Sequence, residues 1–164
     1  YFVERGTEEY TSLNLISLKN EDITGGEIKL DSNFEVQDIK FEGTYSTENN
    51  SFDSVKIDGK DIDTSVSNVS SLYSDFIYSV LNMEADTVEA YAEPENTADE
   101  TITLDLTDGS SIKLDFATKD DNTYYVFKDG EYTGLIARRK ALTKENGVID
   151  YYKQIQTALS IKDN

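Results

Sequence analysis

The chain has 164 residues, and its 33 acidic and 15 basic side chains give a net charge of -18. This charge repels nucleic-acid backbones and anionic lipid surfaces, so we expect neither as a partner. Cysteine and histidine are absent, which excludes disulfides, thiolate and imidazole catalysis and the usual zinc ligand sets. We therefore expect no cofactor. The 11 tyrosines and 7 phenylalanines lie in patterned segments, which favours a globular fold over disorder.

Residues 1–24 are interpreted as a connector from an upstream unit. The chain opens without Met, and Tyr1-Phe2-Val3 is typical of the end of a strand. Gly25-Gly26 then interrupts the pattern, as paired glycines commonly do between elements. We expect residues 25–164 to form a single domain, with any membrane anchor lying upstream of Tyr1.

Strands are predicted before the longest periodic segment of the chain. Ile28 and Leu30 alternate with charged residues, and a second strand is predicted from Phe34 to Phe41. Its apolar positions change parity at Gln37-Asp38, which requires a β-bulge or a break. Val55 and Ile57 indicate another strand, followed by a turn at Asp58-Gly59.

The stretch from Asp63 to Met83 predicts an amphipathic helix at the centre of the fold. Asp63 is the expected N-cap, because its carboxylate can accept from free backbone N–H groups. The opposite face is small and polar, and Tyr78 is the large residue on it. The buried stripe is expected to comprise Val66, Val69, Leu72, Tyr73, Phe76, Ile77, Val80 and Leu81.

After this helix the sequence predicts a series of antiparallel strands. Val88, Ala90 and Ala92 alternate with Glu89 and Tyr91, and the acidic loop 93–100 that follows is expected to be exposed. A hairpin comes next. Its three-residue loop 107–109, with Gly109 in the left-handed region, pairs Leu104 with Ile112 and Ile102 with Leu114.

A second hairpin and a terminal helix complete the predicted fold. A loop of the same length at residues 128–130 would place Tyr124 opposite Gly134. Residues 148–159 have the apolar stripe of a helix. The predicted class is α+β, with an antiparallel meander sheet whose one face is covered by the central amphipathic helix and the C-terminal helix.

The order of these features resembles the bacterial family called domain of unknown function 4340. The resemblance covers about half of the chain. It rests on the Asp-capped helix, the step 82–85, the Thr-Asp-Gly hairpin, the Tyr-Tyr-Val strand at 124–126 and the Lys-Asp-Gly turn. The chain resembles the second, C-terminal copy of the repeated unit, although the family's Tyr-Gly-Leu segment is missing. The resemblance implies an extracytoplasmic domain, tethered to the bacterial membrane at its N-terminus and often associated with ABC-type export systems. It implies no catalytic residues.

The chemistry that the remaining residues could support leaves three functions open. We favour a non-enzymatic extracytoplasmic domain for protein interaction or scaffolding. The first alternative is a carboxylate-dependent hydrolase acting on cell-surface glycans, although no carboxylate pair lies in an apolar sequence setting that would raise a pKa. The second is a calcium-stabilised surface module built on Asp58, Asp61 and Asp63. The spacing of these aspartates lacks the full calcium-loop pattern, and a turn plus an N-cap explains them equally.

Two features are the candidates for contact with a protein partner. Tyr78 is expected on the polar face of the central helix, and Arg138, Arg139 and Lys140 form the single concentrated positive charge of the chain. Tyrosine and arginine are enriched at the energetic centres of interfaces. An exposed tyrosine is also ordinary, and the basic triplet could simply neutralise nearby carboxylates.

Overall fold

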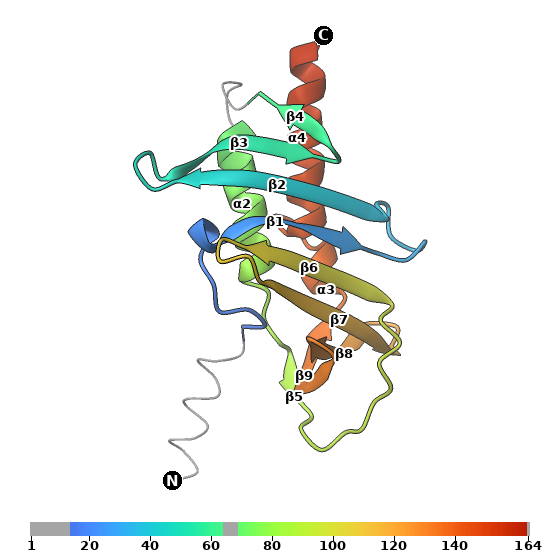
Figure 1. Cartoon of the computed structure of the whole chain (residues 1–164). Coiled ribbons are helices and arrows are strands. Elements are labelled where there is room, and N and C mark those ends of the chain that lie inside the picture. The colour runs from blue at the N-terminus through green and yellow to red at the C-terminus, as the bar shows by residue number, and fades with distance from the viewer. Residues whose placement is uncertain (1–13, 64–68, 164) are drawn as a thin grey trace.

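The computed structural model describes residues 14–63 and 69–163, and the described chain forms one antiparallel nine-stranded sheet with two long helices (Figure 1). The strands are β1 (Ile23–Lys29), β2 (Asp38–Ser46), β3 (Ser51–Ile57), β4 (Lys60–Ile62), β5 (Thr87–Val88), β6 (Glu100–Leu106), β7 (Ser111–Asp120), β8 (Thr123–Lys128) and β9 (Glu131–Arg138). The helices are the 3-10 turn η1 (Asn20–Asp22), α2 (Val69–Leu81), α3 (Lys140–Thr143) and α4 (Val148–Asp163).

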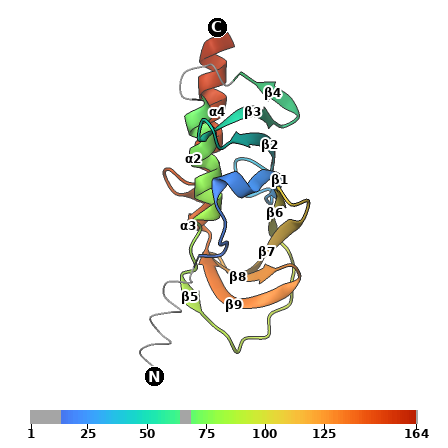
Figure 2. The ribbon, with the colours of Figure 1, turned by 60° about the vertical axis from the view of Figure 1, so that its left-hand side comes forward.

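The sheet consists of two meanders that meet in its middle. The strand order is β4-β3-β2-β1-β6-β7-β8-β9-β5, so β1 joins the N-terminal meander to β6 of the C-terminal one. Helices α2 and α4 lie on the same side of the sheet and pack against each other (Figure 2). The predicted α+β class, with both helices on one face, is confirmed.

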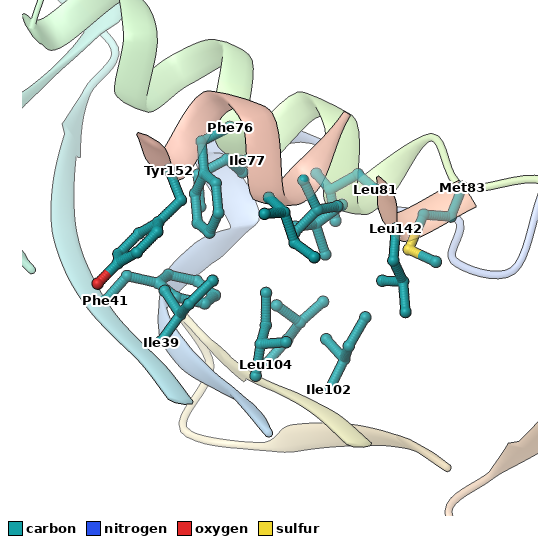
Figure 3. Close-up of a cluster of buried hydrophobic side chains, with 14 of the residues drawn as sticks. Ile39, Phe41, Phe76, Ile77, Leu81, Met83, Ile102, Leu104, Leu142 and Tyr152 are labelled. Atoms are coloured by element: carbon teal, nitrogen blue, oxygen red, sulfur yellow. The ribbon is translucent and has the colours of Figure 1, made fainter. Parts of the chain in front are cut away.

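The apolar stripe of α2 faces the sheet, with Tyr152 of α4 beside it, and forms the centre of the core (Figure 3). The Phe76 ring meets Phe41 of β2 edge-on at 5.1 Å between centroids, and the Tyr73 ring meets Phe52 of β3 at 4.8 Å. Leu72 is half-buried. Val66 and the expected first turn of the helix lie outside the described residues. The described part of the predicted stripe is confirmed.

Gly25 and Gly26 do not break the chain, contrary to the prediction, but lie inside β1. A Cβ atom on Gly26 would be 2.3 Å from the Thr103 carbonyl oxygen and 2.7 Å from the Phe41 ring. The pair therefore permits β1 to pack closely between β2 and β6.

The described part of the predicted connector packs with the rest of the domain. Leu15 and Ile16 are buried in the core, and Ile23 and Thr24 already belong to β1. The Leu15 N–H donates to the Met83 carbonyl at 3.0 Å. Residues 14–24 are thus packed with the fold, whereas the proposed division at residue 24 stays a prediction.

The first predicted hairpin is confirmed and the second is wrong in register. Ile102 pairs with Leu114 and Leu104 with Ile112, and Gly109 has φ +88°. The second loop has only two residues, Asp129 and Gly130, both with positive φ as in a type I′ turn. A bulge in β9 then places Thr133 and Gly134 between the pairs Val126–Leu135 and Phe127–Tyr132, and Tyr124 pairs with Ala137 rather than Gly134.

Two further strand predictions are too long. The break expected at Gln37-Asp38 is real, because β2 begins at Asp38, but residues 34–37 form a loop whose Phe34 is buried. The strand expected over residues 88–92 is limited to Thr87–Val88, and the chain turns directly after it. Alternation in a short apolar segment therefore did not suffice to define a strand.

Candidate interaction site

The basic triplet 138–140 is divided in the structure, because its three side chains lie in different surroundings. Arg138 ends β9 and is mostly exposed, and its Nε lies 2.8 Å from Asp86 Oδ1. Arg139 is half-buried on the face that carries Phe34, whereas Lys140 is exposed at the start of α3. The triplet consequently offers two separate places for binding.

Arg138 belongs to the strand that pairs with the edge strand β5, which carries exposed apolar side chains. Thr87 pairs with Ile136 and Val88 with Leu135, which places this edge directly next to the end of β9. Val88 is 51% exposed and Tyr91 is 100% exposed. We call the set Asp86, Val88, Glu89, Tyr91 and Arg138 the β5-edge surface.

The turn that presents Tyr91 is held firmly against the sheet. The Tyr132 hydroxyl donates to the Glu89 carbonyl at 2.8 Å, and the Glu89 N–H donates to the Gly134 carbonyl at 2.8 Å. Lys119 Nζ donates to Glu89 Oε1 at 2.6 Å, and this bond raises the pKa of the Lys119 amine. The exposed tyrosine therefore extends from a backbone that is already ordered.

Tyr78 lies where the sequence placed it, on the exposed side of α2. It is 61% exposed, and its backbone carbonyl accepts from the N–H and the side-chain amide of Asn82. Val88 and Arg138 thus belong to the paired strands β5 and β9 and Tyr91 follows β5, while Tyr78 belongs to a different element. Tyr91 was missed as a candidate in the sequence because residues 88–92 were predicted as one strand.

The other arginine belongs to a chain of polar groups that enters the core. The Arg139 guanidinium stacks on the Phe34 ring, 3.9 Å from its centroid, and its Nη1 donates to the Tyr124 hydroxyl at 3.3 Å. Behind Tyr124 lies Glu100, which is 1% exposed on the core face of β6. Its Oε1 accepts from the Asp31 N–H at 3.0 Å.

Glu100 has the most unusual electrostatic environment among the described carboxyls. Burial raises its pKa, and the Tyr124 hydroxyl and the Asp31 N–H offset this only in part. Its Oε2 has no hydrogen-bond partner among the described residues. Burial and the nearby Glu100 carboxyl likewise raise the pKa of Tyr124. A single carboxyl therefore does lie in an apolar setting, whereas the expectation from the sequence concerned carboxylate pairs.

Asp58, one of the aspartates considered as calcium ligands, has two protein partners. Asp58 Oδ1 accepts from the Lys40 N–H at 3.0 Å, and Oδ2 accepts from the Tyr152 hydroxyl at 2.5 Å. These bonds join the β3–β4 turn to β2 and α4. Within residues 14–63 and 69–163, no group of three or more acidic residues is placed to hold a metal ion.

Comparison of the chain with protein-family models, curated proteins and solved structures finds no match. The resemblance to the domain of unknown function 4340 family stays a prediction. Across the residues that the structure describes, none of the helices has both the length and the apolar character needed to cross a membrane.

Proposed function

We propose that this domain is a non-enzymatic protein-interaction module that contacts its partner through the β5-edge surface. The observation that carries the proposal is that three exposed side chains, Val88, Tyr91 and Arg138, belong to the edge strand β5, the turn after it and its partner strand β9. Large aromatic and arginine side chains supply much of the binding energy of protein interfaces. The ordered turn beneath Tyr91 reduces the entropy lost on binding.

The charge of this surface favours a basic partner. Among the residues near Tyr91, Glu93 and Glu95 are exposed, and neither forms an ion pair with a described residue. Since Asp86 and Glu89 already hold Arg138 and Lys119, the carboxylates left over attract positive charge. The partner surface should therefore combine apolar contacts for Val88 and Tyr91 with lysine or arginine at its rim.

The cellular setting proposed for the module follows from the resemblance found in the sequence. It is an extracytoplasmic domain of a membrane-tethered bacterial protein, which would act as an accessory to an ABC-type exporter. The high negative charge supports a soluble, exposed domain. Fractionation of cells that express the full-length protein, followed by protease treatment of intact spheroplasts, would test this setting. Protection of the domain from protease would contradict it.

Site-specific photocrosslinking would test the interaction surface. A photoreactive phenylalanine analogue at position 91 should capture the partner, and the same analogue at position 78 should not. With the partner identified, Tyr91→Ser and Arg138→Ser should each weaken binding about tenfold or more, as expected for interface anchors. Both variants should keep nearly the original Tm, because the side chains are exposed.

The variant with the photoreactive analogue at position 78 tests the alternative interface, on α2. Capture from position 78 alone, with unchanged binding by Tyr91→Ser, would assign the interface to α2 instead of the β5-edge surface. Lys140→Ser is the matched control for charge, since Lys140 is exposed but belongs to α3. If Lys140→Ser weakens binding as much as Arg138→Ser does, general electrostatics and not the β5 edge governs the contact.

A further inference from the structure

A cleft of about 490 Å³ has Arg139 in its wall. The loop between β1 and β2, the junction of β9 with α3, and the first half of α4 form its walls. Phe34 and Ile149 supply its apolar lining, and both side chains are otherwise buried. A concave site with an apolar lining and a few polar groups is typical of small-molecule binding.

Basic and acidic side chains are balanced in this cleft, whereas the chain as a whole is strongly acidic. Arg139, Lys144 and Lys153 line it, in a chain with only 15 basic residues. Lys153 is neutralised by an ion pair with Glu35. Among the described residues, neither Arg139 nor Lys144 forms an ion pair.

The Arg139 guanidinium is oriented by the protein without being neutralised by a directly bonded carboxylate. It stacks on Phe34 and donates a hydrogen bond to the neutral Tyr124 hydroxyl. A guanidinium carries five N–H donors, so further donors remain for an oxyanion. The arginine is therefore pre-oriented at the cleft wall, which lowers the entropic cost of binding an anion.

Three acidic side chains also line the cleft and equal its three basic ones in number, so an anion site here rests on the placement of Arg139 and Lys144 and not on net charge. Glu35 is bound to Lys153, and Asp150 Oδ2 accepts from the Asn146 N–H and the Gln154 amide. Glu145 is the remaining acid and is exposed at the rim. The N-terminus of α4 at Val148 also adjoins the cleft, and its helix dipole adds a positive potential.

We propose that this cleft binds a small organic anion, a site independent of the β5-edge surface. The carboxylate or phosphate of the ligand would contact Arg139 and Lys144, because charge-assisted hydrogen bonds to such groups are the strong ones. Its apolar portion would pack on Phe34 and Ile149. The cleft volume fits a ligand of metabolite size.

Titration of the intact domain with three aromatic probes tests the proposal. Benzoate and phenyl phosphate carry the two candidate anionic groups, and benzamide is the neutral isostere of benzoate. Calorimetry and amide NMR at fixed ionic strength should show saturable binding of at least one anion, with shifts concentrated at residues 33–35 and 144–150. The tighter of the two anions identifies the acid group. Equal binding of benzamide, or saturable binding of neither anion, would overturn the proposal.

Variants of the lining residues separate the site from general charge effects. Arg139→Gln and Lys144→Gln should each weaken anion binding about tenfold or more, the size expected for a hydrogen bond to a charged group. Lys140→Gln removes the same charge outside the cleft and should leave affinity within about twofold. Lys144 is exposed, so its variant keeps the fold even if the Arg139 variant loosens Phe34. Unchanged affinity in Lys144→Gln, or an equal loss in Lys140→Gln, would overturn the assignment.

Discussion

Glu100 carries a cost to stability that depends on pH. The folded chain raises its pKa through burial, so the folded state binds this proton more tightly than the unfolded state does. The related stability is fully present below the unfolded pKa of about 4.3 and is lost as pH rises through the folded pKa. At neutral pH the buried group thus destabilises the fold relative to a neutral side chain of the same shape.

Glu100→Gln should accordingly raise the free energy of unfolding at pH 7, by about 1 kcal/mol, the order of a buried unsatisfied group. Its carbonyl can still accept from the Asp31 N–H, and the amide has no charge to desolvate. Denaturant melts at pH 7 and pH 4 measure the effect, which should shrink at pH 4. Glu93→Gln, at an exposed position, is the control for removal of one negative charge and should give a much smaller gain than Glu100→Gln at pH 7. A gain that is equal at both pH values would contradict the role assigned to the charge.

The position of Glu100 could have been found from the sequence. Glu100, Ile102, Leu104 and Leu106 share parity, so extending the predicted strand by two residues places the carboxyl on the buried face. Glu100 was instead predicted to lie in an acidic loop, since charge is normally a sign of exposure. Its partners could not have been found, because Asp31 and Tyr124 are distant in the chain and meet it only through the tertiary fold.

Helix α2 is the element on which most of the core depends. Phe76 is fully buried and contacts Phe41, whereas Asp75 is exposed one position earlier. Phe76→Ala should lower the free energy of unfolding by about 3 to 5 kcal/mol, and Asp75→Ala by no more than about 0.5 kcal/mol. Urea melts of the two variants check the orientation of the helix. Similar losses in both would show that this face assignment is wrong.

The hairpin between β6 and β7 depends on the backbone of Gly109. Its φ of +88° is unfavourable for a β-branched residue, and nothing lies within 4 Å of a Cβ at this position. Gly109→Val should therefore destabilise the fold through backbone strain alone, by about 1 to 3 kcal/mol. Gly109→Asn is the matched variant and should cost less, because asparagine tolerates the left-handed region. If thermal melts show equal losses for the two, strain at φ is not the cause.

The two hairpins show why element predictions differ in outcome. Both contain Asp-Gly, and parity of the apolar residues correctly selected a three-residue loop for the first. In the second, the same loop length was carried over, but the loop has two residues and pairs even positions of β8 with odd positions of β9 on both sides of the bulge between Val126 and Phe127. Buried residues of β9 fall on both parities, so parity did not select a loop there. A bulge leaves no clear mark in residue type, and only the paired strand reveals it.

The arrangement of the whole sheet lies beyond what local patterns determine. The pairing of β1 with β6 joins residues about 78 apart in the chain, such as Gly26 and Leu104. The glycine pair makes this approach possible, although in the sequence it is typical of a break. Likewise, β5 follows α2 in the chain but pairs with β9 at the end of the sheet. The sequence could predict the class and the covered face, but not the neighbours.

At the scale of the whole molecule, the net charge of -18 should make stability rise with salt. The described ion pairs are at least partly exposed, apart from the buried Asp115 side chain, and such pairs contribute about 0 to 1 kcal/mol each. Repulsion among the excess carboxylates acts over longer distances and opposes the compact state. Because salt at about 0.15 M screens charges beyond roughly 8 Å, its main effect here should be to relieve this repulsion.

The Tm should therefore increase between low and moderate NaCl concentrations. The double variant Glu93→Lys and Glu95→Lys changes the net charge from -18 to -14, since each reversal adds two positive charges. Both side chains are exposed, so the variant should melt higher than the original chain at low salt and respond less to added NaCl. The double variant Glu93→Gln and Glu95→Gln changes the net charge by half as much. Its Tm at low salt should therefore lie between the Tm of the original chain and that of the lysine variant. A Tm that decreases with NaCl would mean that the short-range ion pairs outweigh the repulsion of the whole surface.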